Sequence, residues 1–244
     1  VYGTAANFHE KNVIQINDTH PALVIPELMR ILMDDAGLDW DTAWNITTHS
    51  VAYTNHTVLS EALERWPQEL MQSLLPRVWT IITEIARRYQ EKIGNYYHDE
   101  AKTRELAIIW DGQVRMANLC IAGGMAVNGV SALHSDILRN DVFKYQCAME
   151  PEKFKNVTNG IAYRRWLLAS NPGLTSLLEE TIGDGFKTDA SELKKLEKFV
   201  DDKTVQAAAA KVKRENKANF ANYLQKATGQ VIDPDSVSYT HLRA

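Results

Sequence analysis

The segment QINDTHPALVIPELMR, residues 15–30, constrains the fold most, because it joins a buried strand to a helix through a short polar turn. Residues 12–17 are a short apolar run with polar residues on both sides, which predicts a buried strand. Pro21 suits the first turn of the helix that follows. Asp18 and His20 lie between the two elements. They therefore stand at the carboxyl end of the predicted strand, a common place for binding groups in α/β folds.

Size and composition are those of an ordinary globular protein. The chain has 244 residues, 45% of them hydrophobic and 24% charged, and its net charge is −4 without a basic block. Bulk electrostatics therefore suggest no nucleic-acid partner. No run approaches the roughly 18 to 20 apolar residues that span a bilayer, so no membrane partner is expected. The start of the chain lacks the pattern of a secretory signal, and two cysteines make no disulfide framework, which favours a reducing compartment.

Helical patterns dominate the first half of the chain. Asp39 is a suitable N-cap for a short helix. Pro67 opens a longer helical stretch that we expect to close at Gly94 and to be divided at Pro76. Residues 50–59 are β-branched and aromatic, which predicts an extended segment or a loop.

A further apolar helix is predicted from about Val114, interrupted by glycines at 123, 124 and 129. Glycine in a helix interior costs about 1 kcal/mol relative to alanine, so these glycines suggest that the backbone approaches another group closely. Residues 151–174 are polar and irregular, and they predict a domain junction.

Three helices are predicted after the junction, the last over about 202–228 with Gly229 as its stop signal. Strands are few for a chain of this length. The sequence therefore predicts an α/β protein that is rich in helix and that looks like a piece of a larger fold.

Three groups of residues could carry chemistry, and each has a structural alternative. Asp18 could instead cap the next helix, with His20 packed as an ordinary core histidine, and the residues alone favour that reading. Arg164 and Arg165 precede Trp166 and suit a phosphate or carboxylate, but a turn with surface arginines is the better interpretation of that segment alone.

The third group has the side-chain mixture of a carbohydrate site: amides and carboxylates for hydroxyl groups and an aromatic ring for the apolar sugar face. An amphipathic helix over residues 60–66 explains it equally well. The members are Tyr53, Asn55, His56, Glu61, Glu64, Arg65 and Trp66. The histidines have no metal-ligand spacing, so no metal is expected.

Taken in order, four segments resemble the glycogen/maltodextrin phosphorylase family, the α-1,4-glucan phosphorylases. They are QINDTHPALVIPELMRIL, AYTNHTVLSEALERWP, VNGVSALHSDIL and TNGIAYRRWLLASNPGL. Four long motifs in the family's order are far more specific than any one of them. The similarity runs from about residue 13 to residue 236. The chain departs from the family at Met125, where a histidine is usual, and at Ser60 and Tyr163, where prolines are usual.

The resemblance implies a GT-B architecture, in which two α/β domains enclose a deep cleft. Residues 1–157 would be the last part of the N-terminal domain, and residues 158–236 the start of the C-terminal domain. Residues 237–244 do not resemble the family and are expected to be a non-native tail. The implied chain is an internal fragment of a cytoplasmic enzyme that is a homodimer at full length.

The implied reaction is phosphorolysis of terminal α-1,4-glucosyl bonds of glycogen or maltodextrin, giving glucose 1-phosphate. The substrates would be an α-1,4-glucan and inorganic phosphate. The implied cofactor is pyridoxal 5′-phosphate, whose Schiff-base lysine belongs to a segment absent from these residues, so the fragment alone is expected to be inactive. The alternatives are a non-catalytic glucan-binding or structural helical module, and a glycoside hydrolase using Asp18 and a glutamate.

The family's motifs also assign roles to residues of this chain. His56 would be catalytic: its side chain would bind the 6-hydroxyl of the transferred glucosyl unit, and its carbonyl would face the developing oxocarbenium. Trp166 would pack against the cofactor. The remaining positions would bind substrate, and they are Asp18, His20, Glu61, Val130 and Asn159.

Overall fold

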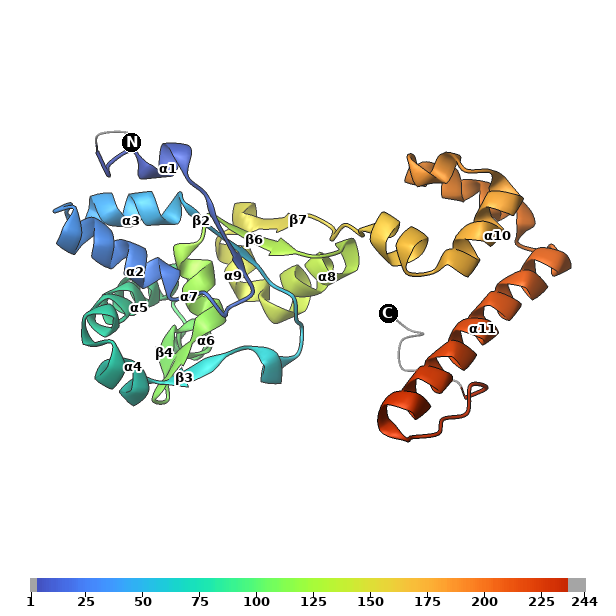
Figure 1. Ribbon diagram of the computed structural model, residues 1–244. Coiled ribbons are helices and arrows are strands. Elements are labelled where there is room, and N and C mark those ends of the chain that lie inside the picture. The colour runs from blue at the N-terminus through green and yellow to red at the C-terminus, as the bar shows by residue number, and fades with distance from the viewer. Residues whose placement is uncertain (1–3, 237–244) are drawn as a thin grey trace. The chain divides into compact units, whose positions relative to one another are not determined.

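The computed structural model describes residues 4–236, which Figure 1 shows as a ribbon. The chain divides into two compact units between Asn159 and Gly160, two residues beyond the junction predicted at 157. The predicted tail, 237–244, lies outside the described residues. Within residues 4–236, no helix is long and apolar enough to cross a bilayer. The same residues contain no group of three or more histidine, cysteine or acidic side chains that could hold a metal ion.

The core of the first unit is a four-stranded parallel sheet, seen at the centre of that unit in Figure 1. The strands in spatial order are β1 (Ile14–Asn17), β2 (Val51–Thr54), β6 (Ala126–Gly129) and β7 (Phe154–Asn156). Ile16 pairs with Tyr53, and Tyr53 pairs with Val127; all three are buried. Since every pair is parallel, the carboxyl ends of all four strands meet at one edge of the sheet.

Helices surround this sheet. Before β2 they are α1 (Phe8–Lys11), α2 (Val24–Arg30), the π-helical turn η1 (Ile31–Asp35) and α3 (Trp40–Thr48); after it come α4 (Gln68–Leu74), α5 (Pro76–Tyr97) and α6 (Glu100–Leu106). Pro76 begins α5 and Asp39 caps α3, both as predicted. The predicted end of α5 at Gly94 was wrong. The helix continues to Tyr97 because His98, with φ of 50°, takes the left-handed position that ends it.

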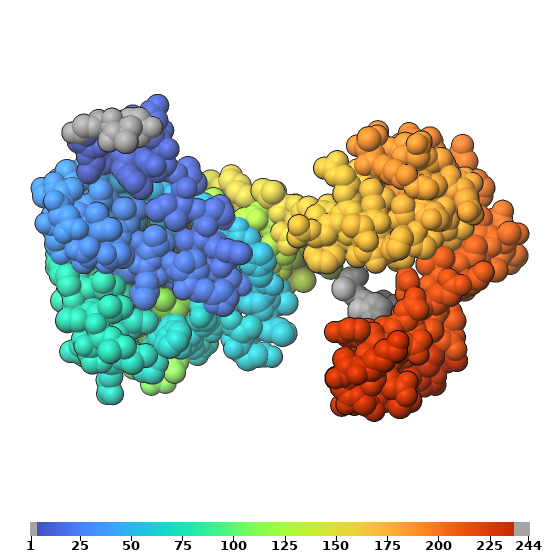
Figure 2. Space-filling view, viewed as in Figure 1, coloured from blue at the N-terminus to red at the C-terminus, as the bar shows by residue number. Residues whose placement is uncertain are grey.

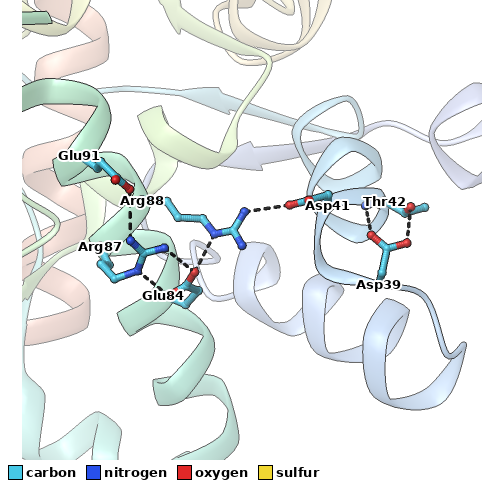
Figure 3. Close-up of polar contacts among 7 residues, drawn as sticks. All are labelled: Asp39, Asp41, Thr42, Glu84, Arg87, Arg88 and Glu91. Atoms are coloured by element: carbon cyan, nitrogen blue, oxygen red, sulfur yellow. Dashed lines mark hydrogen bonds and ion pairs between the residues drawn. The ribbon is translucent and has the colours of Figure 1, made fainter. Parts of the chain in front are cut away.

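An ion-pair network joins α3 to α5 (Figure 3). Glu84 accepts hydrogen bonds from Arg87 and Arg88, and these bonds lower the pKa of Glu84 to about 2. Arg88 also donates to Asp41 on α3, at 2.8 Å. The guanidinium of Arg88 lies 4.9 Å from the centre of the Trp40 ring. Arg88 is therefore fixed between the two helices both by its ion pairs and by the stacking of its guanidinium on the Trp40 ring.

A small antiparallel sheet replaces part of the helix predicted from Val114. It consists of β3 (Arg65–Pro67), β5 (Gln113–Arg115) and β4 (Ile109–Trp110), in that order. β4 and β5 form a hairpin through Asp111 and Gly112, whose φ angles are 51° and 69°. An Asp-Gly pair with positive φ at both residues is the usual two-residue hairpin turn. The helix α7 begins only afterwards and spans Met116–Gly123.

The glycines at 123, 124 and 129 do not interrupt a helix, so that interpretation was wrong. Gly123 ends α7, Gly124 follows it, and Gly129 ends β6. A Cβ at Gly123 would lie 2.6 Å from Cγ2 of Ile25, and one at Gly129 would lie 2.8 Å from Cα of Ser135. The close approach that the glycines allow is therefore between elements of the first unit itself.

The remaining elements of the first unit lie between β6 and β7. They are α8 (Ala132–Ile137), the π-helical turn η3 (Leu138–Val142), α9 (Lys144–Met149) and the 3-10 turn η4 (Pro151–Lys153). Figure 1 shows α8 beside β6 and β7. Its N-cap Ser131 accepts a hydrogen bond from the His134 amide at 3.1 Å, which fixes His134 at the start of the helix.

The described residues of the second unit, coloured from yellow to red in Figure 2, form helices and helical turns but no strand. Its elements are the π-helical turn η5 (Arg164–Ala169), α10 (Pro172–Ile182), the 3-10 turns η6 (Gly185–Lys187) and η7 (Ala190–Phe199), and α11 (Lys203–Thr228). α11 begins at its N-cap Asp202 and stops at Gly229, whose φ is 76°, as predicted. Of the hydrophobic residues described in this unit, only Leu178 and Phe186 are buried.

Gly129→Ala tests the close approach at the end of β6. The added methyl group would meet the backbone of Ser135, so we expect the free energy of unfolding to fall by about 1–3 kcal/mol. Gly94→Ala is the matched control: Gly94 lies inside α5 with nothing within 4 Å of the added Cβ, so alanine should be neutral or stabilising by about 0.5–1 kcal/mol. Urea unfolding followed by tryptophan fluorescence measures both, and equal effects would contradict the packing described.

Candidate functional site

Residues that the sequence singled out follow each of the four parallel strands at the same edge of the sheet. Asp18 follows β1, Asn55 and His56 follow β2, Val130 follows β6, and Asn159 lies three residues after β7. Backbone hydrogen bonds continue beyond the strands: the Asp18 amide donates to Thr54 at 2.9 Å, and the Asn55 amide donates to Asn128 at 3.0 Å. The parallel register thus brings these five residues to one edge of the sheet.

The turn that ends β1 has a strained backbone. It does not fit the structural alternative, in which Asp18 caps the next helix and His20 packs in the core. Asp18 has φ of 62°, unusual for a residue with a side chain, and its Oδ1 accepts from the Thr19 amide at 2.7 Å. The side chain does not cap α2, whose N-cap is Leu23. His20 is not packed in the core; it is exposed, with Nδ1 3.3 Å from Oε1 of Glu64.

Glu64 also accepts a hydrogen bond from the hydroxyl group of Thr19, which is buried. One carboxylate therefore contacts two consecutive residues of the turn after β1. Because Glu64 immediately precedes β3, it ties this turn to the small antiparallel sheet.

The imidazole of His56 contacts the last residue of the neighbouring strand. Its Nε2 lies 2.5 Å from Oδ1 of Asn17, at the end of β1. An amide oxygen accepts, so Nε2 is the donor, and in the neutral imidazole Nδ1 keeps its lone pair. His56 is exposed, which leaves Nδ1 as an acceptor for a donor outside the chain.

A buried chain of hydrogen bonds links β2 to β6. Asn55, which is fully buried, donates from Nδ2 to the Tyr53 hydroxyl at 2.9 Å. Its Oδ1 lies 3.1 Å from Nε2 of His134, and Nδ1 of His134 accepts from the Val130 amide at 3.1 Å. His134 must therefore be neutral with its proton on Nε2. Burial also raises the pKa of Tyr53, so this network holds no charge.

Val130 and Asn159 are joined directly. The Asn159 amide donates to the Val130 carbonyl at 2.9 Å, and the Val157 amide donates to Oδ1 of Asn128 at 2.6 Å. The backbone of Asn159 is thus held against the end of β6, and its exposed side chain is left for other partners. His56 is connected to this pair through its chain neighbour Asn55 and through His134.

Glu61 and Trp166 are not among the residues that these bonds join. Glu61 lies in the 3-10 turn η2 (Ser60–Ala62) and is exposed beside Trp66, in a shallow hollow. The helix considered over residues 60–66 does not form, because β3 begins at Arg65. Trp166 belongs to η5 in the second unit, where the residue is 63% exposed.

The sequence analysis did not single out Asn17 or His134. It included Asn55 among the residues with the composition of a carbohydrate site but did not predict where in the fold Asn55 lies. A signal was available for the two asparagines. Asn17 is the last residue of β1 and Asn55 the first residue after β2, and each is polar directly behind an apolar run. No comparable signal marks His134, which is brought to Asn55 by the packing of α8.

Comparison with known proteins gives a consistent result. The family model described as carbohydrate phosphorylase matches residues 2–243. The chain is 49% identical over 240 residues to the brain form of glycogen phosphorylase from Bos taurus, covering 97% of this chain. It is 49% identical over 234 residues to the muscle form from Homo sapiens, covering 94% of this chain. The chain spans only 28% of the length of either relative.

Asn55→Ala tests the buried link between β2 and β6. It would leave three groups without their partner: the Tyr53 hydroxyl, the Thr57 amide and Nε2 of His134. Because each buried unpaired group costs about 1–3 kcal/mol, we expect a loss of about 2–4 kcal/mol in the free energy of unfolding.

Asn45→Ala is the matched control, because Asn45 is exposed on α3, where alanine is the better helix former. It should be neutral or slightly stabilising. Urea unfolding of both variants decides the matter, and an Asn55→Ala protein as stable as the control would show that the link carries little energy.

Proposed function

Because the chain belongs to the carbohydrate phosphorylase family, we propose that it forms part of an α-1,4-glucan phosphorylase, a glycosyltransferase of glycogen degradation. The reaction would be phosphorolysis of terminal α-1,4-glucosyl bonds of glycogen or maltodextrin to glucose 1-phosphate. The observation that carries the proposal is the edge of the parallel sheet, where Asp18, His56, Val130 and Asn159 follow adjacent strands. The relatives named glycogen phosphorylase support glycogen as the glucan.

In this proposal His56 and Asn159 hold the glucosyl unit that is transferred. Nδ1 of His56 accepts a hydrogen bond from a sugar hydroxyl, because Nε2 is occupied by Asn17. The Asn159 side chain binds a second hydroxyl, while its backbone stays fixed to Val130. Asp18 and His20 line the side of the site that accepts the glucan, and Glu61 lies beside the glucosyl unit that is transferred.

Bond cleavage places positive charge on the anomeric carbon of the glucosyl unit. An oxygen of inorganic phosphate forms the new bond to this carbon, and the departing sugar keeps the glycosidic oxygen, which takes up the proton that the hydrogen phosphate gives up. The His56 carbonyl is a fixed dipole that would face the charged carbon. Such a preorganised dipole stabilises the transition state without reorganisation. The uncharged network of Asn55 and His134 behind it keeps that position rigid.

We propose pyridoxal 5′-phosphate as the cofactor, with Trp166 as the residue of this chain that contacts it. Trp166 fits such a role because a largely exposed indole offers a flat apolar surface to a planar ring. When bound, the cofactor would supply a phosphate group that exchanges a proton with the substrate phosphate. Arg164 and Arg165 are exposed next to Trp166 and suit a phosphate partner.

The wider architecture is also a proposal. A GT-B fold, with the first unit as part of the N-terminal domain and the second as the start of the C-terminal domain, is supported by the parallel sheet and by the division after Asn159. We further propose a cytoplasmic homodimer for the full-length protein. The free thiols of Cys120 and Cys147 support a reducing compartment. A non-catalytic glucan-binding module and a hydrolase are not favoured, because the relatives are phosphorylases.

His56→Ala in the full-length enzyme tests the glucosyl site. The variant loses one hydrogen bond to the sugar but keeps the backbone carbonyl, so we expect kcat/KM to fall by about 10–100-fold, equivalent to about 1.5–3 kcal/mol. Formation of glucose 1-phosphate from maltodextrin and phosphate is the measurement. His98→Asn is the control, because asparagine also tolerates the left-handed end of α5. A kcat/KM of His56→Ala equal to that of the control would remove His56 from the site.

The 244 residues on their own should give no glucose 1-phosphate with pyridoxal phosphate, maltodextrin and phosphate added. Two phosphate groups repel each other, and only fixed cations and helix N-termini hold them together. The groups hydrogen-bonded at the sheet edge are instead carboxylates, amides and imidazoles. Turnover above background that His56→Ala abolishes would contradict this expectation.

A further inference from the structure

The sequence contains two Asn-Gly pairs, Asn128–Gly129 and Asn159–Gly160. An asparagine before glycine can lose its side-chain amide without an enzyme, because the backbone nitrogen of the next residue is within reach and glycine has no Cβ to hinder it. The reaction needs a side chain that can turn toward that nitrogen and a backbone that can rotate to bring the two together. The two pairs therefore differ in reactivity according to how firmly the fold holds each of them.

The first pair is held by the parallel sheet. Oδ1 of Asn128 accepts from the Val157 amide at 2.6 Å, and its carbonyl accepts from the Asn55 amide at 3.0 Å. Gly129 is buried at the end of β6, in register with Asn156 of β7. The Asn128 side chain can reach the Gly129 nitrogen only when this end of the sheet opens, so the reaction there is slow in the folded protein.

The second pair lacks these restraints. Asn159 and Gly160 are exposed, and residues 157–162 belong to no helix or strand. Within residues 4–236, neither the Asn159 side chain nor the Gly160 amide has a hydrogen-bond partner. The bond that holds Asn159 runs from its backbone amide to the Val130 carbonyl at 2.9 Å, and it does not restrain the side chain or the peptide bond that follows. That peptide bond is also the boundary between the two compact units.

Neither backbone conformation nor packing requires glycine at position 160. Gly160 is not among the glycines with positive φ, and a Cβ added to it would have nothing within 4 Å. Gly129 is the opposite case, because a Cβ there would lie 2.8 Å from Cα of Ser135. Alanine at position 160 can therefore test the chemistry of the pair without disturbing the fold.

We propose that Asn159 is a site of spontaneous deamidation in the folded protein. The Gly160 nitrogen attacks Cγ of Asn159: the N–Cγ bond forms, the Cγ–Nδ2 bond breaks, and Nδ2 leaves as ammonia with the proton of the Gly160 amide. Water then opens the cyclic imide at either of its carbonyls and gives aspartate or isoaspartate. Water is the only co-reactant, and no group is oxidised or reduced.

Deamidation would change what Asn159 offers to a ligand. An amide both donates and accepts hydrogen bonds, whereas a carboxylate only accepts them and carries a negative charge. In the proposed glucosyl site this change replaces a neutral donor by an anion near inorganic phosphate, and the two repel each other. This consequence rests on the proposed function, but the deamidation itself does not.

Incubation of the 244-residue chain at mildly alkaline pH, followed by tryptic peptide mapping in a mass spectrometer, tests the proposal. Asn128 is the internal reference in the same molecule. We expect Asn159 to convert at least about 10-fold faster than Asn128, since a local opening that costs about 1.4 kcal/mol already slows a reaction tenfold. In guanidinium chloride, where no sheet protects Asn128, the two pairs should convert at similar rates.

Gly160→Ala is the deciding variant. Its methyl group hinders the attacking nitrogen, so conversion of Asn159 should slow by about 10-fold, while the midpoint of urea unfolding should stay unchanged. Gly94→Ala is the matched control, because the added Cβ also has nothing within 4 Å but lies inside α5. It should keep the original rate at Asn159.

Three results would each overturn the proposal. The first is an intact Asn159 in the folded chain after a time in which the unfolded chain converts. The second is conversion of Asn159 and Asn128 at equal rates in the folded chain. The third is an equal rate at Asn159 in the Gly160→Ala and Gly94→Ala proteins.

Asn159→Asp in the full-length enzyme is a separate readout, which concerns the consequence for catalysis. Its kcat/KM should fall by about 10-fold, because a hydrogen-bond donor to the sugar is lost. If Asn159 deamidates but this variant keeps full activity, the deamidation stands and the sugar contact proposed for Asn159 fails.

Discussion

The parallel hydrogen-bond ladder of β1, β2, β6 and β7 is the constraint on which the rest of the first unit depends. Because all four strands run in one direction, whatever follows them is delivered to one edge of the sheet. Asp18, His56 and Val130 are far apart in the sequence, yet each is the first or second residue after a strand. A slip of one residue in any pair would turn the side chains to the opposite face and separate these groups.

The link between β2 and β6 is made rigid by amide and imidazole groups and not by ion pairs. Asn55 is fully buried, and its side-chain amide is hydrogen-bonded to Tyr53, Thr57 and His134. A neutral network of this kind is costly to interrupt but imposes no charge on the neighbouring site. In the proposed site, the exposed His56 would therefore face a sugar in an environment whose electrostatics are set by the ligand and by Glu64 and Asp18.

Much of the local structure could be predicted from the sequence, because its signals are local. Pro76, Asp39 and Gly229 mark ends of helices where they were expected, and the polar residues after β1 and β2 mark the site edge. The pairing of β2 with β6 could not be predicted, since 71 residues separate Thr54 from Ala126 and no periodic pattern connects them. For the same reason the glycines were wrongly placed inside a helix, although the close approach expected of them is confirmed: Gly129 ends β6, and it is close to Ser135 only after α8 has packed on the sheet.

The central claim is that the carboxyl edge of the parallel sheet holds the glucosyl unit during transfer. A crystal structure of the full-length protein with glucose 1-phosphate bound tests it most directly. The account predicts that Nδ1 of His56 and the side chain of Asn159 each lie within about 3.2 Å of a different hydroxyl oxygen of the glucosyl ring, while Nε2 of His56 stays on Asn17. A glucosyl ring bound elsewhere, with His56 and Asn159 both facing solvent, would contradict it.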